Sequence, residues 1–361
     1  MFTPNYKITP LITNYLMDIE ASRQAVSSLP VTLTLLNSLR ESARLTSTHY
    51  STQIEGNRLT QEQVEDVIKG SSFPNRKRDE SEVKNYYQAL AYVDTLIENN
   101  KAEITEKDIQ TIHGLVMDGR QKPTKYRDGQ NVIRDSASGG IVYMPPEASD
   151  MASLMKQLVK WINQQMQQAE LPAPIIAGIA HYQFATIHPY YDGNGRTARL
   201  LTNLILHKAG YGLKGIYSLE EYYARDLPNY YDALTVGPSH NYYMGRVEAD
   251  ISNWVSYFCH GMADAFASVR IKTEEAAKQG STSDHSALLR ELDQRQKLVL
   301  NLFKESRYIS TGQVADLFKL HKRSALNICN SWVEDEFIKV EGTSKKLRKY
   351  ELAGKWQVLV S

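Results

Sequence analysis

The stretch of the sequence richest in reactive groups is residues 188–199, which read HPYYDGNGRTAR. A histidine, a carboxylate, a glycine-rich turn and two arginines occur there within twelve residues. Histidine is the side chain whose ordinary pKa suits proton removal near neutral pH. Arginine binds phosphate through paired N–H donors, and glycine lets successive backbone N–H groups face one anion. The stretch therefore predicts a phosphate site beside a general base.

Two helices must position this stretch. Apolar residues and helix formers fill residues 174–187, and Pro189 predicts that this helix ends just after His188. Residues 200–209 have helical apolar spacing and are followed by glycine, the usual residue just past a helix C-terminus. Residues 193–195 then form a turn that enters a helix N-terminus, where the backbone N–H groups and the helix dipole attract anions.

Charges at the start of the second helix also predict an anionic ligand. Arg196 and Arg199 lie in its first turn, where the helix dipole disfavours each cation by roughly 0.3–1 kcal/mol. A bound polyphosphate would compensate for both charges. Asp192 offers the hard oxygen that Mg²⁺ prefers beside phosphate oxygens and water. His188 is the candidate base for removing a proton from a hydroxyl group.

The whole stretch resembles the signature of the Fic family, HPFx[D/E]GNGRxxR, and differs from it only at Tyr190, where the family has phenylalanine. Tyr190 can keep the packing of that ring beneath the loop, but its hydroxyl needs a partner if it is buried. The resemblance implies a mainly α fold, a Fic helical core with a β-hairpin flap. It also implies an enzyme that moves AMP from ATP to a Tyr, Thr or Ser hydroxyl of a protein.

The resemblance gives each residue of the stretch a role. It implies that His188 is the catalytic base and that Asp192 holds Mg²⁺. The glycine turn would cradle the α- and β-phosphates of ATP, and the two arginines would hold the β- and γ-phosphates. The implied ATP-binding residues of the stretch are Gly193, Asn194, Gly195, Arg196, Thr197, Ala198 and Arg199.

A second motif lies earlier in the chain, at Ser51, Glu55 and Gly56. Ser51 and Glu55 are four residues apart on one helix face, and Gly56 predicts the end of that helix. Such a pair is usually a solvated helix face. The string also resembles the inhibitory motif [S/T]xxxE[G/N] of Fic proteins. That resemblance implies an inhibitory helix at about 40–56, in which Glu55 pairs with Arg199 and fills the space of the γ-phosphate.

The pattern changes from helical to β-prone at residues 131–146. Two short β-prone runs flank a Ser/Gly turn at residues 136–140, which predicts a β-hairpin. A plain surface hairpin would give the same pattern. Its position before the signature resembles that of the Fic flap. This resemblance implies that residues 131–144 bind an extended segment of a target protein by strand addition.

Residues 218–234 hold a further pair of candidates for nucleotide binding. Their YYxxL element resembles the part of the family that contacts adenosine, so Tyr230 and Arg225 are candidates for the base and ribose side of ATP. The alternative is a core face, since tyrosines at helical spacing usually pack inside. Residues 236–241 depart from the charged segment of many relatives, so no adenine contact is assigned to Asn241.

Six further helices are predicted before residue 276, with a charged connection at residues 73–80. A capping box of Thr60 with Gln63 starts one helix, and Thr105 caps another. The predicted helices span residues 8–29, 31–55, 60–68, 81–98, 105–118 and 248–275.

Residues 276–286 are polar and rich in helix breakers, which predicts a linker. Beyond it, residues 287–361 are predicted to contain a helix at 291–306, a capping box of Ser310 with Gln313, a turn, a helix at 324–336 and a two-stranded tail. That is the order of a winged helix-turn-helix. The predicted division is an N-terminal helical region (1–100), a Fic core (101–275), the linker and this domain.

The C-terminal domain is the basic part of the chain. Residues 286–361 hold fourteen Lys and Arg against nine Asp and Glu, a net charge of about +5. Lys322, Arg323 and the wing residues 345–349 contribute to it, so DNA is a candidate partner. A domain that docks protein is the alternative, because residues 334–336 are acidic and would repel DNA.

Composition and charge set limits on the whole chain. Its 361 residues are enough for two domains or for one large domain with an appendage. They are 42% hydrophobic and 23% charged, as is usual for soluble globular proteins. A net charge of +1 predicts no general attraction to nucleic acid or membranes. Cys259 and Cys329 lack metal-site spacing, and neither a signal peptide nor a membrane-spanning run is present. We therefore expect a cytoplasmic protein.

Three functions remain open from the sequence. The first is a protein adenylyltransferase inhibited by Glu55, for which self-modification and a homodimer are further expectations. The second is a DNA-binding regulator whose Fic core senses nucleotide. The third is an enzyme that removes AMP from a modified protein, with Glu55 positioning the water.

Overall fold

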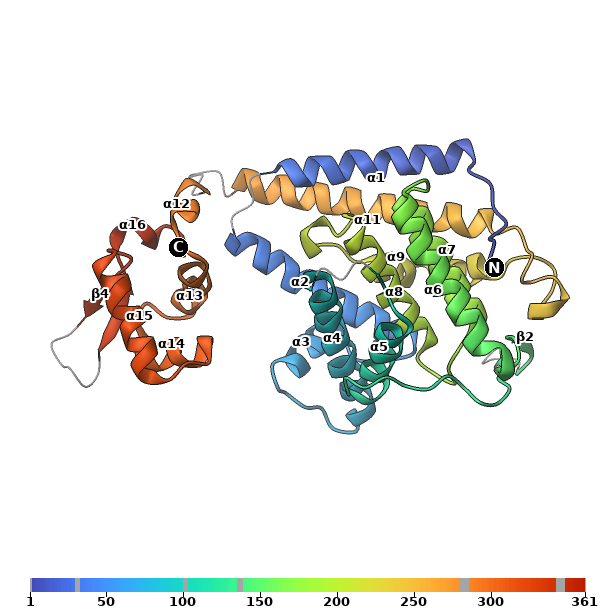
Figure 1. Cartoon of the computed structure of the whole chain (residues 1–361), viewed down its shortest axis with the longest axis horizontal. Coiled ribbons are helices and arrows are strands. Elements are labelled where there is room, and N and C mark those ends of the chain that lie inside the picture. Colours follow the sequence, from blue (N-terminus) through green and yellow to red (C-terminus); the bar gives the residue numbers. More distant parts are fainter. Residues whose placement is uncertain are drawn as a thin grey trace. The chain divides into compact units, whose positions relative to one another are not determined.

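The structure is a computed structural model of the chain, and it describes residues 2–29, 33–99, 103–134, 139–279, 286–341 and 348–360. The chain divides into two compact units (Figure 1). The first comprises residues 1–29 and 38–274, and the second comprises residues 30–37 and 275–361.

The first unit is built almost entirely of helices. Two of their first turns are capped at the residues that the sequence predicts: Thr60 with Gln63 forms a capping box, and so does Thr105 with Asp108. In chain order the helices are α1 (Pro10–Ser28), α2 (Leu33–Ile54), α3 (Gln61–Ile68), α4 (Lys77–Glu98), α5 (Glu106–Asp118), α6 (Met151–Gln168), α7 (Ala173–Ile187), α8 (Asn194–Lys208), α9 (Leu219–Arg225), α10 (Leu227–Leu234) and α11 (Ser252–Gln279), with 3₁₀ turns at Ala148–Asp150, Leu213–Gly215 and Tyr242–Met244.

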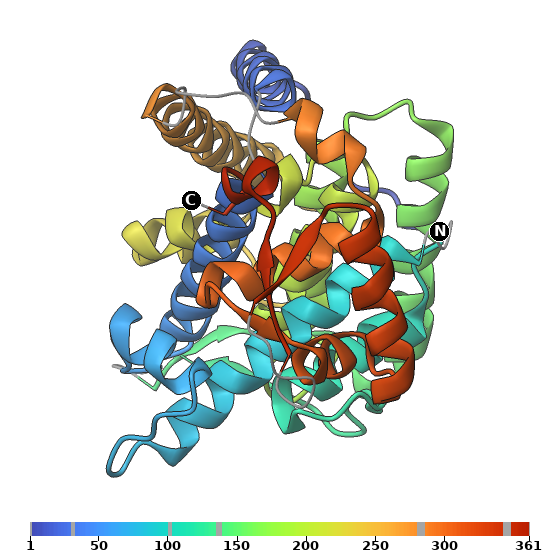
Figure 2. The same ribbon diagram turned by 90° about the vertical axis from the view of Figure 1, so that its left-hand side faces the viewer.

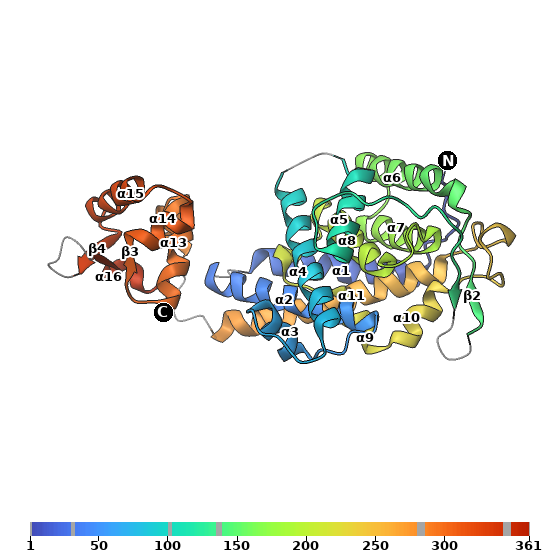
Figure 3. The same ribbon diagram turned by 90° about the horizontal axis from the view of Figure 1, so that it is seen from below.

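The centre of this unit is the pair α7 and α8. Nearly every side chain of α7 is buried, which matches its unbroken apolar sequence. α11 packs on α7: Trp254 Nε1 donates to Gly178 O at 2.7 Å, and a Cβ on Gly178 would lie 2.8 Å from the Phe258 ring. α6 runs beside α7 on another side (Figures 1 and 3). The connection between α7 and α8 is therefore held in place by a packed core.

α1 and α11 lie side by side along one edge of the unit, and Figure 2 shows them end-on. The segment before α1 is fastened to the start of α11, where Lys7 N donates to Ser252 Oγ at 2.8 Å. The rings of Tyr15 and His260 are in contact farther along, with centroids 4.9 Å apart. The N-terminal helix is thus an integral part of the first unit.

The predicted hairpin is present as β1 (Ile133–Arg134) and β2 (Ile141–Tyr143), which pair antiparallel with an irregular register. Residues 135–138 of the predicted turn lie outside the described residues. Beyond β2, Met144 N donates to His240 O at 2.7 Å, and Tyr242 N donates to Met144 O at 3.1 Å. The outer edge of the hairpin is therefore already paired at the end of β2.

The second unit has its own hydrophobic core, which includes Trp332, Phe337 and Tyr350. The strands among its described residues are ordered β3-β5-β4, and neighbouring strands are antiparallel. The elements are α12 (Ser286–Glu291), α13 (Gln294–Glu305), β3 (Ile309–Ser310), α14 (Thr311–Phe318), α15 (Lys322–Glu334), β4 (Ile338–Glu341), β5 (Lys349–Leu352) and α16 (Gly354–Gln357). This order agrees with the predicted winged helix-turn-helix, whose assignment and DNA binding stay predictions. Residues 345–347 of the predicted wing lie outside the described residues.

Several predicted boundaries were wrong. α4 begins at Lys77, so half of the predicted connection at 73–80 is helical. α11 begins at Ser252 and continues to Gln279, into the predicted linker, of which residues 280–285 are outside the described part of the chain. α6 was not predicted at all. Within the described ranges, no helix is long and apolar enough to cross a membrane.

Candidate active site

The reactive stretch is the connection between α7 and α8. His188 follows the last residue of α7 and has left-handed backbone angles with φ 51°, and Pro189 cannot continue the helix. Gly193, with φ 76°, precedes α8. A side chain is strained at such a φ, and a Cβ at Gly193 would also lie 2.6 Å from Met117 Sδ. This position therefore requires glycine.

His188 is oriented by the last turn of its own helix. Its backbone N–H donates to Phe184 O at 3.0 Å, and its ring Nδ1 donates to Ala185 O at 3.4 Å. Because the Nδ1 proton is used there, the lone pair of Nε2 remains available to accept a proton. Burial lowers the pKa of His188 to about 4, so the ring is neutral at physiological pH. This is the state that a general base needs.

Asn194 and His113 hold the loop in shape. Asn194 Oδ1 accepts from Tyr190 N at 3.0 Å, and Asn194 Nδ2 donates to Tyr190 O at 2.8 Å. The His113 ring of α5 stacks on the Tyr190 ring with centroids 3.5 Å apart, and its Nε2 donates to Asp192 O at 2.9 Å. The Asn194 side chain is thus used within the loop, and Tyr190 packs beneath it. The Tyr190 hydroxyl is buried without a hydrogen-bond partner in the described part of the chain.

Arg127 connects the loop to the base of the hairpin. Its backbone N–H donates to Pro189 O at 2.9 Å. Its guanidinium donates to three carbonyl oxygens: His188 O at 3.0 Å, Gly129 O at 2.9 Å and Pro146 O. Arg127 is 3% exposed. Arg127 therefore fixes the backbone of His188, the candidate base.

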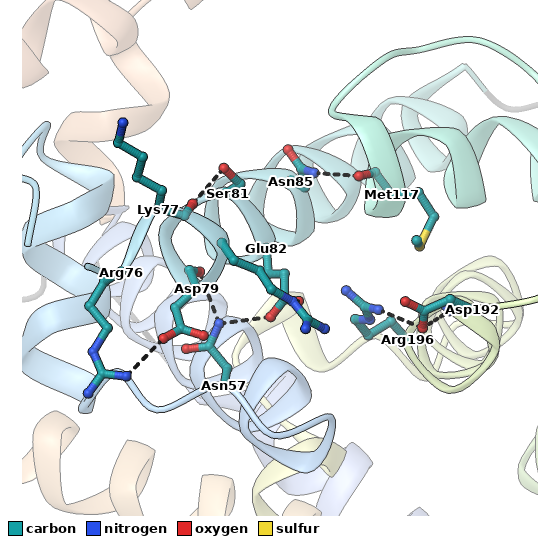
Figure 4. Close-up of polar contacts among 12 residues, drawn as sticks. Asn57, Arg76, Lys77, Asp79, Ser81, Glu82, Asn85, Met117, Asp192 and Arg196 are labelled. Atoms are coloured by element: carbon teal, nitrogen blue, oxygen red, sulfur yellow. Dashed lines mark hydrogen bonds and ion pairs between the residues drawn. The ribbon is translucent and has the colours of Figure 1, made fainter. Parts of the chain in front are cut away.

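Asp192 and Arg196 face each other beside the glycine turn (Figure 4). Arg196 Nη2 lies 3.2 Å from Asp192 Oδ1, which also accepts from Gly193 N at 2.6 Å. The Asp192 side chain is 55% exposed, whereas that of Arg196 is 3% exposed. Asp192 Oδ2 bonds to no other described residue. One carboxylate oxygen thus holds the turn and the other faces solvent.

This carboxylate fits a magnesium ion whose remaining ligands come from a bound molecule and water. No group of three or more His, Cys, Asp or Glu in the described ranges could hold a metal by itself. Mg²⁺ at nucleotide sites usually takes one or two carboxylates and completes its shell with phosphate oxygens and water. The free Oδ2 of Asp192 can supply that single carboxylate ligand.

The second arginine of the stretch, Arg199, is bound by α2. Its Nε donates to Ser51 Oγ at 2.8 Å, and its Nη2 donates to Ser51 O at 2.9 Å and to Glu55 Oε1 at 2.8 Å. Burial alone would lower the pKa of Arg199, but the Glu55 carboxylate and nearby tyrosines more than offset this and raise it. A Cβ at Gly195 would collide with Glu55 Oε1. The carboxylate of Glu55 therefore lies directly on the glycine turn.

Polar groups at the start of α8 remain without partners. Among the described residues, Arg196 Nε, Thr197 Oγ1 and Arg199 Nη1 are buried and form no hydrogen bond. Thr197 and Ala198 are fully buried. A buried unpaired donor costs about 1–3 kcal/mol. Two of these groups are guanidinium donors, which an anionic ligand would satisfy.

Tyr230 belongs to the core beneath α8. It is 2% exposed, and its hydroxyl donates to His181 Nε2 at 3.0 Å. His181 Nδ1 in turn donates to Thr202 Oγ1 at 3.0 Å. Burial lowers the pKa of His181 to about 3, so this ring is also neutral. Tyr230 therefore supports α8 from inside.

The structure does not place Arg225 in contact with residues 188–199. It lies on the surface, where its guanidinium pairs with Asp264 at 2.8 Å and with Glu221 at 3.3 Å. The neighbouring Tyr231 is closer to the site, since its hydroxyl donates to Ile54 O, at the end of α2, at 3.3 Å. Its ring is half-exposed. Arg225 remains only a prediction as a ribose contact.

Three residues of the site were missed from the sequence: Arg127, His113 and Tyr231. Arg127 stands in the Tyr-Arg pair before the hairpin, a signal that could have indicated it. His113 and Tyr231 lie in ordinary helical patterns, and their contacts cross between elements far apart in the chain. No local pattern marks them.

Residues 103–206 match the Fic/DOC family. The "Protein adenylyltransferase Fic" of Drosophila willistoni is 31% identical over 201 residues, which cover 54% of this chain and 38% of that protein. The protein of the same name from Aedes aegypti is 32% identical over 199 residues, with 54% and 38% covered. The chain thus spans about two fifths of the length of these curated relatives.

The fold is shared with solved structures. A crystal structure of a Fic family protein from Desulfovibrio desulfuricans G20 is 25% identical, with a TM-score of 0.59, and the match covers 98% of this chain and 99% of that one. The predicted mainly α fold with a Fic core is therefore confirmed.

Proposed function

Since the chain carries a Fic domain at residues 103–206, we propose that it is a protein adenylyltransferase that is held inactive by Glu55. The reaction would transfer AMP from ATP to a hydroxyl group of a protein. The curated relatives named for this activity support the proposal over about half of the chain.

In the proposed step, the oxygen of the acceptor hydroxyl attacks the α-phosphorus of ATP. The bond between that phosphorus and the bridging oxygen breaks, and pyrophosphate leaves. His188 Nε2 accepts the proton of the hydroxyl, which its neutral state allows. Mg²⁺ bound beside Asp192 would neutralise phosphate charge. The N-terminus of α8 would stabilise the negative charge of the phosphates.

The observation that best supports a phosphate ligand is the pair of unsatisfied arginine donors. Arg196 Nε and Arg199 Nη1 are buried and lack partners among the described residues, although both side chains start from the first turns of α8. The helix dipole opposes cations at this end. A polyphosphate would accept the missing hydrogen bonds and compensate for the unfavourable positive charge.

The inhibitory role of Glu55 is supported by where its carboxylate lies. It occupies one face of Arg199 and lies against Gly195, the positions that the sequence assigns to phosphates. Ser51 holds the same guanidinium with two more hydrogen bonds. ATP would have to compete with α2 for Arg199, so its α-phosphorus would be badly placed for in-line attack.

We also propose that the target protein docks on the hairpin at residues 131–144. The end of β2 is already paired with residues 240–242, so an added strand would lie along the other edge, which β1 forms. Backbone hydrogen bonds would then position the acceptor hydroxyl, with little demand on target sequence.

The test is transfer of label from α-³²P-ATP to the protein itself and to a cell lysate. We expect strong labelling with Glu55→Gly, weak labelling with wild type, and none with Glu55→Gly combined with His188→Ala. Gln53→Gly is the matched control: Gln53 is exposed in the last turn of the same helix, so this variant should label as wild type does.

Absence of label from Glu55→Gly, with ATP binding confirmed by calorimetry, would reject the transferase. Release of AMP from a labelled protein by wild type, but not by Glu55→Gly, would instead identify the AMP-removing enzyme.

A further inference from the structure

A cavity of about 380 Å³ lies between α2, α4 and the end of α8 with the segment that follows it. Its lining includes Arg40 and Ser47 of α2, Asp94 of α4 and His207 of α8. Twelve residues of α8 separate Gly195 from His207, a rise of about 18 Å. The cavity is therefore distinct from the phosphate turn. Its size lies within the range of about 300–1,000 Å³ that is usual for small-molecule sites.

The charged residues of the cavity leave one cation in excess. The lining holds Arg40, Arg44 and Lys214 against Asp94 and Glu98. Arg44 is paired with Asp94. Arg40 Nε donates to Lys214 O, but the Arg40 guanidinium forms no ion pair with any described residue. Its two terminal nitrogens are therefore free to bind an anion in bidentate fashion.

The rest of the lining is mostly apolar. Leu90, Val93 and Ile97 come from one face of α4, and the Tyr217 ring lies in the segment after α8. The His207 side chain forms no hydrogen bond in the part of the chain that the structure describes, and burial lowers its pKa. Its neutral ring can donate to or accept from an occupant. One anionic group joined to an apolar body would match this lining.

Residues on one face of α2 contact both the cavity and the phosphate turn. Arg40, Arg44, Ser47, Ser51 and Glu55 follow one another at intervals of three or four residues, so they lie on one helix face. The first three line the cavity, and the last two bind Arg199. A ligand in the cavity would therefore contact the same face that inhibits the site.

A buried hydrogen-bond network ties this face of α2 to its neighbours. Glu220 is 1% exposed and accepts from Ser47 at 3.0 Å, Tyr86 at 3.1 Å, Asn203 at 3.2 Å and Ser218 at 3.0 Å. These donors come from α2, α4, α8 and the start of α9. Ser47 is the donor from α2, so displacement of α2 would break its bond to Glu220 and open the cavity, whereas the other three bonds do not involve α2.

We propose that the cavity binds a small organic anion, whose carboxylate or phosphate group contacts Arg40 and whose apolar body packs on α4, and that this ligand holds α2 in its inhibitory position. The second half rests on the proposed inhibitory role of Glu55. A ligand that bridges α2 to α4 binds the docked state more tightly than the released state. By linkage it must then oppose any ligand that requires Arg199 to be free.

The first arm of the test measures binding to the full chain by calorimetry, with phenyl phosphate, benzoate and inorganic phosphate as probes. We expect at least one of the two aromatic anions to bind wild type, and its affinity to fall about tenfold or more in Arg40→Gln. Arg270→Gln is the matched control, since it removes the same charge from a surface ion pair on α11. It should bind as wild type does.

Preference for phenyl phosphate or for benzoate assigns the anionic group. No binding of either aromatic anion at millimolar concentration, or equal binding by Arg40→Gln, would overturn the cavity as an anion site. This arm needs no enzymatic activity, so its outcome is independent of the proposed transferase.

The second arm measures ATP affinity with and without saturating probe. The probe should weaken ATP binding to wild type about fivefold or more and leave Glu55→Gly unchanged. Weakening that persists in Arg40→Gln would mean direct competition at the phosphate turn. That result, or no effect on wild type, would overturn the regulatory half of the proposal.

Discussion

Arg127→Lys is expected to destabilise the first unit and to slow AMP transfer at the same time. The Arg127 guanidinium donates to His188 O, Gly129 O and Pro146 O from one planar group. Lysine keeps the charge, but its compact ammonium cannot reach three carbonyl oxygens that the wide guanidinium spans. We expect one or two of these hydrogen bonds to be lost.

The size of the effect follows from the charge on the donor and from its burial. A hydrogen bond to a charged group contributes about 1.5–3 kcal/mol. Losing one or two should lower the free energy of unfolding by about 1.5–6 kcal/mol. The His188 backbone would lose its anchor, and a displacement of about 1 Å at a reacting group can cost on the order of 100-fold in rate.

The assay combines urea unfolding with label transfer in the Glu55→Gly background. Arg134→Lys is the control, because Arg134 is an exposed arginine of the same hairpin whose guanidinium, within the described ranges, donates to Gly139 O alone. It should change the free energy of unfolding by no more than about 0.5 kcal/mol. If Arg127→Lys behaved as this control does in both measurements, the anchoring role of Arg127 would be refuted.

Three further outcomes are expected. Glu55→Gln keeps a hydrogen-bond acceptor for Arg199 but removes its charge, so calorimetry should show ATP affinity about fivefold above wild type and below Glu55→Gly; equal affinities for Glu55→Gln and wild type would contradict this. Tyr190→Phe removes a buried hydroxyl without a described partner, so urea unfolding should show a free energy within about 1 kcal/mol of wild type, and a larger loss would reveal a partner. Burial lowers the pKa of His181 to about 3 and of His188 to about 4, below the ordinary value of about 6.5, so the unfolded chain protonates first on acidification. Stability is therefore retained above about pH 6.5 and lost as the pH falls toward 3, by up to about 1.4 kcal/mol per pH unit for each ring; flat stability between pH 6.5 and 4.5 would refute this assignment.

The residues whose roles are local were predictable from the sequence. Pro189 and the glycines specify where α7 ends and α8 begins, because they act on the backbone at their own positions. The contact of Ser51 and Glu55 with Arg199 crosses more than 140 residues, and only the family resemblance indicated it. Arg127 donates hydrogen bonds to backbone carbonyls of several segments. Such a role produces no periodic pattern in the sequence, so periodicity could not predict it.

Two errors in helix prediction have physical causes. The charged run before residue 81 was interpreted as a connection, but Asp79 and Glu80 lie in the first turn of α4, where acidic residues interact favourably with the helix dipole. Glu80 also accepts from Phe73 N, which helps to fix the start of the helix. α6 has buried residues at helical spacing, among them Met151, Met155 and Leu158, a signal that was present in the sequence and not used.

The hydrogen bonds between the Asn194 side chain and the Tyr190 backbone also affect how readily Asn194 is deamidated. Asn194 is followed by Gly195, and in an unfolded chain such a pair is prone to deamidation, because glycine lets the next backbone nitrogen attack the side-chain amide. Here the amide is bonded to both backbone groups of Tyr190, and the first turn of α8 keeps the Gly195 nitrogen in helical geometry. A carboxylate at position 194 would place an oxygen against Tyr190 O, where a donor is needed. Damage to the loop should therefore accumulate with the time that molecules spend unfolded, rather than with their age.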